Sequence, residues 1–256
     1  MRSGKKTYRW LSIVSFFVIM AAWCLITYGG LVKPLFVPSP SDVIHQLVLA
    51  FQDGSLWLNC GASTRRVMVG WFLSALVALP CGMLMARSPK FTAIVQPVIE
   101  FVRYLPVVAL VPLTILYLGI GETQKYIIIW LGTFFQLVLM VCDTVASVDK
   151  NQINAARTLG TNKYQVYKEV IFPASLPGLL DDFRLTIGWA WTYLVVAEMV
   201  AASDGLGYII LKSQRFLATD VIFMGLFLIG FIGLVTDFLM KLLTKLLVPW
   251  RRRLTD

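Results

Sequence analysis

Charged residues are scarce in this chain of 256 residues. They make up 14% of it, whereas hydrophobic residues make up 58% and the mean hydropathy is +0.75. Soluble domains carry about a quarter charged residues, so this composition excludes an ordinary soluble domain and predicts an integral membrane protein. The net charge of +9 does not indicate nucleic-acid binding, because the basic residues are scattered in short loops between apolar runs.

Residues for metal binding and nucleophilic catalysis are also few. The chain has one histidine, His45, and its four cysteines form no Cys-x-x-Cys pair. A zinc site, a disulfide framework and a Ser-His-Asp triad are therefore not expected. The sequence also lacks a Gly-x-x-x-x-Gly-Lys-Ser/Thr phosphate loop, so we expect no ATPase site, cofactor or metal in this chain.

Six apolar segments predict an all-α membrane protein with one transmembrane domain over residues 1–256. We place the spans at about 10–28, 67–86, 91–118, 126–147, 179–202 and 221–247. Three prolines, Pro97, Pro106 and Pro112, interrupt the third span, and prolines bend a spanning helix.

Basic residues set the expected orientation. Those ahead of the first span, Arg2, Lys5, Lys6 and Arg9, predict a cytoplasmic N-terminus. The groups Arg87–Lys90, Lys150–Lys168 and Arg251–Arg253 then lie inside as well. Both termini are therefore predicted to be cytoplasmic.

A long polar loop at about 149–177, between the fourth and fifth spans, predicts two short helices. Gly160 is expected to end the first helix, Thr161 to cap the second and Pro173 to stop it. Small residues early in the loop allow close packing. We therefore predict a compact docking knob on the cytoplasmic side.

The spacing in this loop resembles the coupling loop of ABC importer permeases. Asn154-Ala155-Ala156 is followed by Gly160 and Val170-x-Phe172-Pro173, where the family has Glu-Ala-Ala, three residues, Gly, nine residues and Ile-x-Leu-Pro. Ala-Ala-Arg-Thr-Leu-Gly, Phe-Pro-Ala-Ser-Leu-Pro, Val-Ala-Glu-Met-Val-Ala-Ala and Gly-Leu-Gly-Tyr are similar to the nitrate/sulfonate/taurine/bicarbonate branch. The resemblance covers nearly the whole chain. Asn154 departs from the family Glu, so an acidic contact to the ATPase would be missing.

The resemblance implies a type I ABC importer permease fold in the bacterial cytoplasmic (inner) membrane. It implies a homodimer, two cytoplasmic ATPase subunits that hold ATP and Mg²⁺, and an extracytoplasmic substrate-binding protein. The implied cargo is a small anion of the taurine/sulfonate, nitrate or bicarbonate class. The residues that it assigns to ATPase coupling are Asn154, Ala155, Ala156, Arg157, Gly160 and Pro173.

Ionisable residues within the spans are further candidates, because a charge in a bilayer is costly. Arg103 and Arg184 could pair with Glu100, Glu198 or Asp143 and hold the bundle, or a guanidinium could face a central cavity and attract an anion. The candidates for the translocation pathway or for bundle ion pairs are Arg103, Asp143, Arg184, Trp189, Thr192 and Glu198.

Helical spacing relates two further pairs of residues. Trp189 and Thr192, at i,i+3, share one face of the fifth span, while Trp191 points elsewhere. Asp237 and Lys241 stand at i,i+4 near the inner end of the sixth span.

Two other functions stay open on the sequence. An ion-gradient-driven secondary transporter would usually show an inverted repeat with charges at matching points, and neither is apparent. A structural or assembly membrane protein would use the Ala-Ala-x-x-x-Gly loop only for packing. Neighbouring genes for an ATPase and a secreted binding protein would favour the importer.

Overall fold

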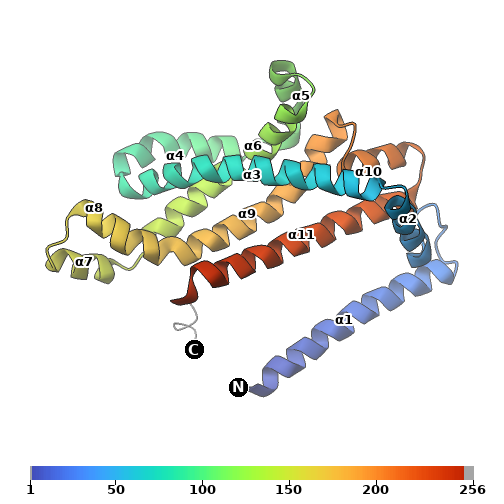
Figure 1. Cartoon of the computed structure of the whole chain (residues 1–256), viewed down its shortest axis with the longest axis horizontal. Coiled ribbons are helices and arrows are strands. Elements are labelled where there is room, and N and C mark those ends of the chain that lie inside the picture. Colours follow the sequence, from blue (N-terminus) through green and yellow to red (C-terminus); the bar gives the residue numbers. More distant parts are fainter. Residues whose placement is uncertain (1, 251–256) are drawn as a thin grey trace.

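The computed structural model describes residues 2–250, with the side chains of residues 2–9, 12 and 201 left aside. Its elements are all helical, which confirms the predicted all-α class (Figure 1). The basic side chains of the N-terminus and the cluster Arg251–Arg253 lie outside the described part. In chain order the helices are α1 (Arg2–Tyr28), α2 (Pro40–Gln52), α3 (Ser55–Arg87), α4 (Pro89–Arg103), α5 (Val107–Leu118), α6 (Glu122–Ala146), α7 (Lys150–Thr158), α8 (Lys163–Gln165), the π-helix η1 (Val166–Ile171), α9 (Phe172–Ala201), α10 (Leu206–Arg215) and α11 (Thr219–Leu247).

The centre of the bundle is formed by α3, α6 and α9, which pack along one another (Figure 1). Small residues on α3 permit this packing. A Cβ atom at Gly70 would lie 2.7 Å from the Cβ of Ile129, and one at Gly82 would lie 2.7 Å from the carbonyl oxygen of Val138. Glycine at these points lets the backbones of α3 and α6 approach closely, as in membrane helix pairs.

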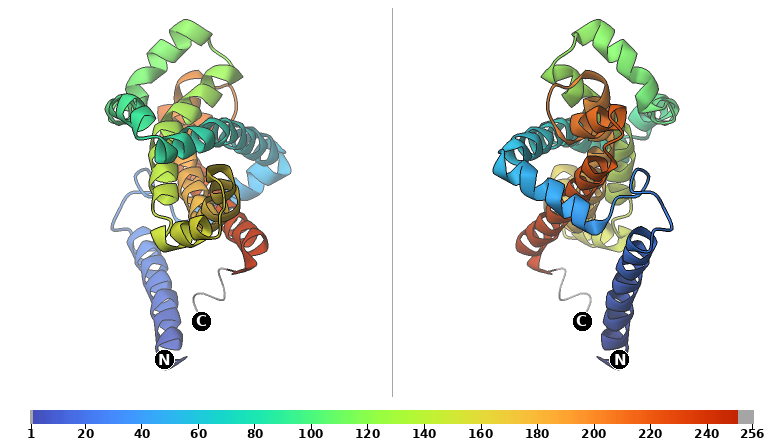
Figure 2. Two further views of the ribbon diagram at one scale, coloured as in Figure 1. Left: turned by 90° about the vertical axis from the view of Figure 1, so that its left-hand side faces the viewer. Right: turned by 90° about the vertical axis from the view of Figure 1, so that its right-hand side faces the viewer.

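The third apolar segment is broken into α4 and α5, which meet at an angle of 99°. Of the three prolines in this segment, Pro106 stands at the break, while Pro97 and Pro112 lie inside the two helices. A proline disfavours the α conformation of the residue before it, so Leu105 leaves the helix. The break sets α5 at a steep angle to α4, so that its far end projects from the bundle (Figure 2) while Val111 packs against α6 and α9.

The N-terminal helix α1 leans away from the central bundle (Figure 2). Its described contacts with the rest lie near its C-terminal end, where Trp23 packs against Phe223 and Phe227 of α11 and donates a hydrogen bond to the carbonyl oxygen of Pro38 at 3.1 Å. The helix α2 packs on α11 near this point.

Three helices of the described chain are long and apolar enough to cross a membrane, namely α3, α6 and α11. The bent pair α4 and α5 makes a fourth if it counts as one span. The helix α9 is not among these helices, and the apolar part of α1, Ile13–Tyr28, is short. The count of six spans therefore stays a prediction. The helix α3 begins at Ser55 rather than near the predicted Val67, which places Arg66 inside it.

Candidate functional site

The polar loop projects from one end of the bundle as two short helices, α7 and α8 (Figure 1). The side chain of Asp149 accepts a hydrogen bond from the amide of Asn151 at 2.8 Å and begins α7. Gly160 follows the helix with φ +83°, a left-handed conformation that favours glycine. Thr161 then donates its hydroxyl to the carbonyl oxygen of Ala156 at 2.6 Å. The turn is thus fixed by its own hydrogen bonds.

Two predicted boundaries of the second helix are wrong. Asn162, not Thr161, caps α8, and it forms a capping box with Gln165. Thr161 cannot serve because its hydroxyl already bonds back to α7. Pro173 does not stop the helix, since η1 runs directly into α9 from Phe172. Pro173 stands at the junction of η1 and α9, and a π-helical turn is one of the local adjustments that accommodate a proline within a continuing helix.

The predicted coupling residues differ in exposure. Ala156 is buried where α7 packs on η1, whereas Asn154, Ala155, Arg157 and Gly160 are exposed, and Pro173 is half-buried. Two large apolar side chains that the sequence analysis did not select, Leu159 and Tyr164, are also exposed, at 84% and 65%. Both residues lie close to Gly160 in an otherwise polar loop, and this position could have identified them from the sequence.

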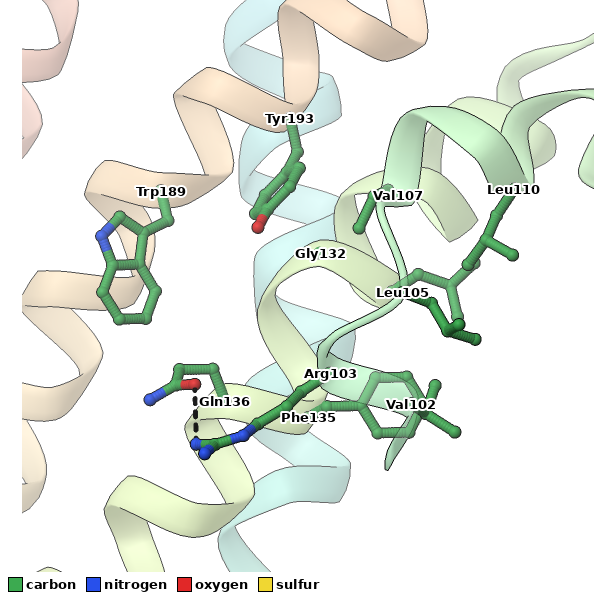
Figure 3. Close-up of a pocket in the computed structure, with 11 residues that line it drawn as sticks. Val102, Arg103, Leu105, Val107, Leu110, Gly132, Phe135, Gln136, Trp189 and Tyr193 are labelled. Carbon is green, nitrogen blue, oxygen red and sulfur yellow. Dashed lines mark hydrogen bonds between the residues drawn. The ribbon is translucent and has the colours of Figure 1, made fainter. Parts of the chain in front are cut away.

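A cavity of about 240 Å³ lies between the α4–α5 break, α6 and α9. Figure 3 shows Arg103 on one side and Trp189 and Tyr193 of α9 on another, with Gln136 of α6 beside the guanidinium. The remaining lining is mostly apolar, from side chains such as Leu110. Arg103 and Trp189, both predicted candidates, therefore border the same space.

Arg103 has only uncharged partners in the described chain. Its Nη1 lies 3.5 Å from Oε1 of Gln136, and its Nη2 donates to the hydroxyl of Tyr104 at 3.0 Å. The guanidinium also lies 4.8 Å from the centroid of the Tyr104 ring, a cation–π distance. The guanidinium keeps unused N–H donors for another acceptor.

Glu198 lies in a different place, a buried ion cluster near the end of the bundle opposite α7. Its side chain is 0% exposed and accepts hydrogen bonds from Arg66 at 2.7 Å, from Ser63 at 2.9 Å and from the amide of Gly207 at 2.8 Å. The Arg66 side chain is 1% exposed and also contacts Glu122 at 2.6 Å. These contacts join α3, α6, α9 and the start of α10.

The loop before α10 is fitted to this carboxylate. Arg66 also binds the Asp204 side chain and its carbonyl oxygen, and Asn59 accepts a hydrogen bond from the amide of Gly205 at 2.8 Å. Any side chain at Gly205, which has φ +109°, would overlap the carboxylate of Glu198. The segment Gly-Leu-Gly is therefore required for close approach to Glu198.

The ion pairs expected from the sequence are not those the structure forms. Arg184 binds Asp237 of α11 rather than Glu100, Glu198 or Asp143, and Glu198 takes Arg66 as its partner. Lys241 joins Asp237 at 2.6 Å, as their spacing suggests. Asp143 is exposed near the α7 end of α6, and Thr192 is exposed on α9.

Tryptophans two residues apart on α9 point different ways. Trp189 lines the cavity, whereas Trp191 is buried and donates a hydrogen bond to Thr236 of α11 at 3.2 Å. The alternation predicted for these two side chains is thus present in the structure.

A bundle of long apolar helices with a projecting polar loop and a half-open cavity between its helices is the architecture of a membrane transport subunit. Residues 78–253 match the family described as "Binding-protein-dependent transport system inner membrane component", and the chain belongs to this family. It is the permease subunit of an ABC importer, a class that works with ATPase subunits and a binding protein.

Relatives and a solved structure agree with this assignment. The taurine transport system permease protein TauC of Escherichia coli (strain K12) is 34% identical over 262 aligned positions, covering 98% of this chain and 95% of that protein. SsuC of Bacillus subtilis (strain 168), named as an aliphatic sulfonates transport permease protein, is 32% identical and covers 98% of this chain and 91% of its own length. The fold is similar to a chain of the inward-facing MetNI methionine ABC transporter, with a TM-score of 0.66 and 20% identity over 74% of this chain and 96% of that one.

Proposed function

We propose that this chain forms the translocation pathway for a small organic anion, most simply a sulfonate such as taurine, in the bacterial inner membrane. Two copies form the pathway, two separate ATPase subunits bind the loop α7–α8 from the cytoplasm, and a binding protein delivers cargo from the other side. Both termini then lie in the cytoplasm. The observation that carries the proposal is the projecting loop, which is held by its own Thr161–Ala156 hydrogen bond and exposes Leu159 and Tyr164.

The loop is mechanically suited to pass on a movement of the ATPases. Its turn is fixed by the Thr161–Ala156 hydrogen bond, and η1 continues without a break into α9. The helix α9 carries Trp189 and Tyr193 to the cavity wall. A rigid displacement of α7 and α8 therefore moves one wall of the cavity, which is how a packed helix transmits an effect over its length.

A second copy would be placed at the exposed face of α5. Leu116 and Tyr117 at its far end are 74% and 79% exposed, and Ile120 in the turn that follows is 76% exposed. Packing this projecting helix on a second permease would cover it with protein and close the cavity beside Arg103 from the lipid.

The proposal is tested by cross-linking from a cysteine at the exposed Ala155. The tagged permease is purified with the ATPase encoded beside it and treated with a bifunctional thiol reagent, with and without ATP. We expect a cross-link to the ATPase whose yield changes with ATP. A cysteine at Ser203, at the opposite end of the bundle, is the control and should give none.

The two rival functions predict different results. A secondary transporter would take up cargo in response to an ion gradient in vesicles that contain no ATPase. A structural membrane protein would leave uptake unaffected when its gene is deleted. Either result, or the absence of an Ala155 cross-link in an intact complex, would contradict the proposed coupling.

A further inference from the structure

We propose that the cavity beside Arg103 binds the anionic head group of the cargo in transit, and that its apolar walls select an organic sulfonate over nitrate or bicarbonate. This inference rests on the proposed function and adds to it the site that binds the sulfonate and the physical reason for its selection. It places Arg103 in contact with the cargo, together with Gln136, Trp189 and Tyr193 as the polar and aromatic members of the wall.

The first argument is the distribution of charge. In the described chain, Arg66 and Arg184 are matched with carboxylates, whereas Arg103 has none. The first two arginines are therefore already neutralised and hold helices together. An ionised side chain within a spanning segment is costly unless it faces protein, water or a counter-ion. Of these three arginines, Arg103 is therefore the one whose guanidinium stays available for an anion that passes between the helices.

The second argument is the geometry of the guanidinium. Its contacts with Gln136 at 3.5 Å and with the Tyr104 hydroxyl at 3.0 Å are to neutral groups, and the first is long. Bonds to a charged oxygen are stronger than bonds to neutral acceptors, so an oxyanion can replace the Gln136 contact. The planar fork of donors matches two oxygens of a sulfonate group. A single arginine without further cations suits a site that must also release its ligand.

The third argument is the size and character of the cavity. Its volume of about 240 Å³ has room for more than a four-atom anion, and most of its lining is apolar. The rings of Trp189 and Tyr193 face the space opposite Arg103 in Figure 3. An anion with a short carbon chain can place its head group at Arg103 and cover these rings. Nitrate and bicarbonate would leave the apolar wall uncovered and gain no stabilisation from it.

The cavity depends on one close contact between α6 and α9. A Cβ atom at Gly132 would overlap the ring of Tyr193, so glycine is what allows the tyrosine to lie across α6. The cavity is therefore built by two helices that would otherwise stand further apart, and it is connected through α9 to the loop that meets the ATPases.

The test uses the complete importer, with ATPases and binding protein, reconstituted in liposomes. Uptake of radiolabelled taurine is measured at saturating binding protein for the wild type, R103Q, R103K and K245Q. The last removes one positive charge from the exposed end of α11, away from the cavity, and is the control. We expect R103Q to lower the maximal uptake rate by about tenfold or more, since a hydrogen-bonded charge is lost. KM, which the binding protein sets, should change less than about twofold.

The lysine variant separates cargo binding from helix capping. Arg103 ends α4, where a positive charge also favours the helix dipole. Lysine keeps that charge but lacks the fork of donors. We expect R103K to fall between the wild type and R103Q. Wild-type uptake rates in both R103K and R103Q would overturn the site, because Arg103 would then contribute only to α4.

A second variant leaves the arginine in place. Q136E puts a carboxylate beside the guanidinium with almost no change of volume, so it neutralises Arg103 and should lower uptake about as much as R103Q. Its complex should be at least as stable to heat as the wild type. If R103Q fails to assemble, Q136E decides the question, and wild-type uptake in Q136E would overturn the proposal.

Direct uptake assays identify the substrate class. Isotopically labelled butane-1-sulfonate and nitrate are supplied separately at equal concentration, and the uptake rate of each is measured. We expect the sulfonates to be transported and nitrate to be transported at least about tenfold more slowly. Because the same binding protein serves every variant, W189A, which removes an apolar ring from the wall, should narrow that ratio if the cavity contributes to the selection. Faster uptake of nitrate would overturn the substrate class and leave the importer function intact. ATP-dependent uptake of none of these anions by the wild type would instead overturn the proposed function.

Discussion

Replacing Glu198 with glutamine tests whether the buried ion cluster holds together the ends of four helices that lie opposite the α7–α8 loop. The change keeps the shape of the side chain and removes its charge. Glu198 accepts hydrogen bonds from Arg66 at 2.7 Å, Ser63 at 2.9 Å and the amide of Gly207 at 2.8 Å. A glutamine has one oxygen and one NH₂ group, so at least one of these donors loses its acceptor.

The magnitude follows from what remains around Arg66. Leaving one partner of a buried pair unmatched costs about 3–5 kcal/mol. Arg66 still has Glu122 at 2.6 Å and the carboxylate of Asp204, so the loss should be smaller. One missing charge-assisted hydrogen bond is worth about 1.5–3 kcal/mol. We therefore expect E198Q to lower the free energy of unfolding by about 2–3 kcal/mol, or the unfolding midpoint by about 4–12 °C.

The assay is thermal unfolding of the purified permease complex in detergent, followed by tryptophan fluorescence. Glu100→Gln is the matched control. Within residues 2–250 the Glu100 side chain bonds only to Gln96 of the same helix, so this change should shift the midpoint by less than about 2 °C. Amide hydrogen exchange adds a local measurement, since E198Q should increase exchange at Gly207. An E198Q midpoint equal to that of the wild type would refute the role of this cluster in stability.

Three other changes probe separate parts of the chain. Gly160→Ala should lower ATP-coupled uptake because alanine is strained at φ +83° by about 1–2 kcal/mol. Gly30→Ala, at φ +70° outside the loop, is the control. Equal uptake in both variants would contradict the coupling role of the loop. Gly132→Ala should slow uptake without blocking ATPase binding because it displaces a cavity wall, and unchanged uptake rates would count against that wall. Hydrogen bonds from the Ser39 side chain and amide hold the pKa of the Asp42 carboxyl below its ordinary value. Protection of α2 amides from exchange should therefore be present at neutral pH and fall as the pH drops through that lowered pKa; protection that rises on acidification would contradict the capping box.

Local sequence features predicted the helical class and much of the loop. Long apolar runs predict helices because each helix satisfies its own backbone hydrogen bonds. Gly160 predicts a helix end because glycine, which has no side chain, readily adopts the left-handed conformation that ends a helix, here with φ +83°. The i,i+4 spacing of Asp237 and Lys241 brings them to 2.6 Å for the same reason, since neighbours on one helix face depend only on helical geometry. The predicted start of the second helix at Thr161 and its predicted end at Pro173 were wrong. The Thr161 hydroxyl bonds back to Ala156 instead of capping α8, and η1 continues into α9 through Pro173.

Contacts between helices were decided by the tertiary structure alone. Arg66 and Glu198 are 132 positions apart, and pairing them requires α3 and α9 to lie side by side at the right depth. No local rule distinguishes Arg66 from Arg103, yet packing surrounds one with three carboxylates and gives the other a neutral cavity. The sequence by itself thus determined which segments are helices and which loop is polar. Only the packing of those helices determined that Arg66 and Arg184 are neutralised by carboxylates and that Arg103 faces a cavity with uncharged partners.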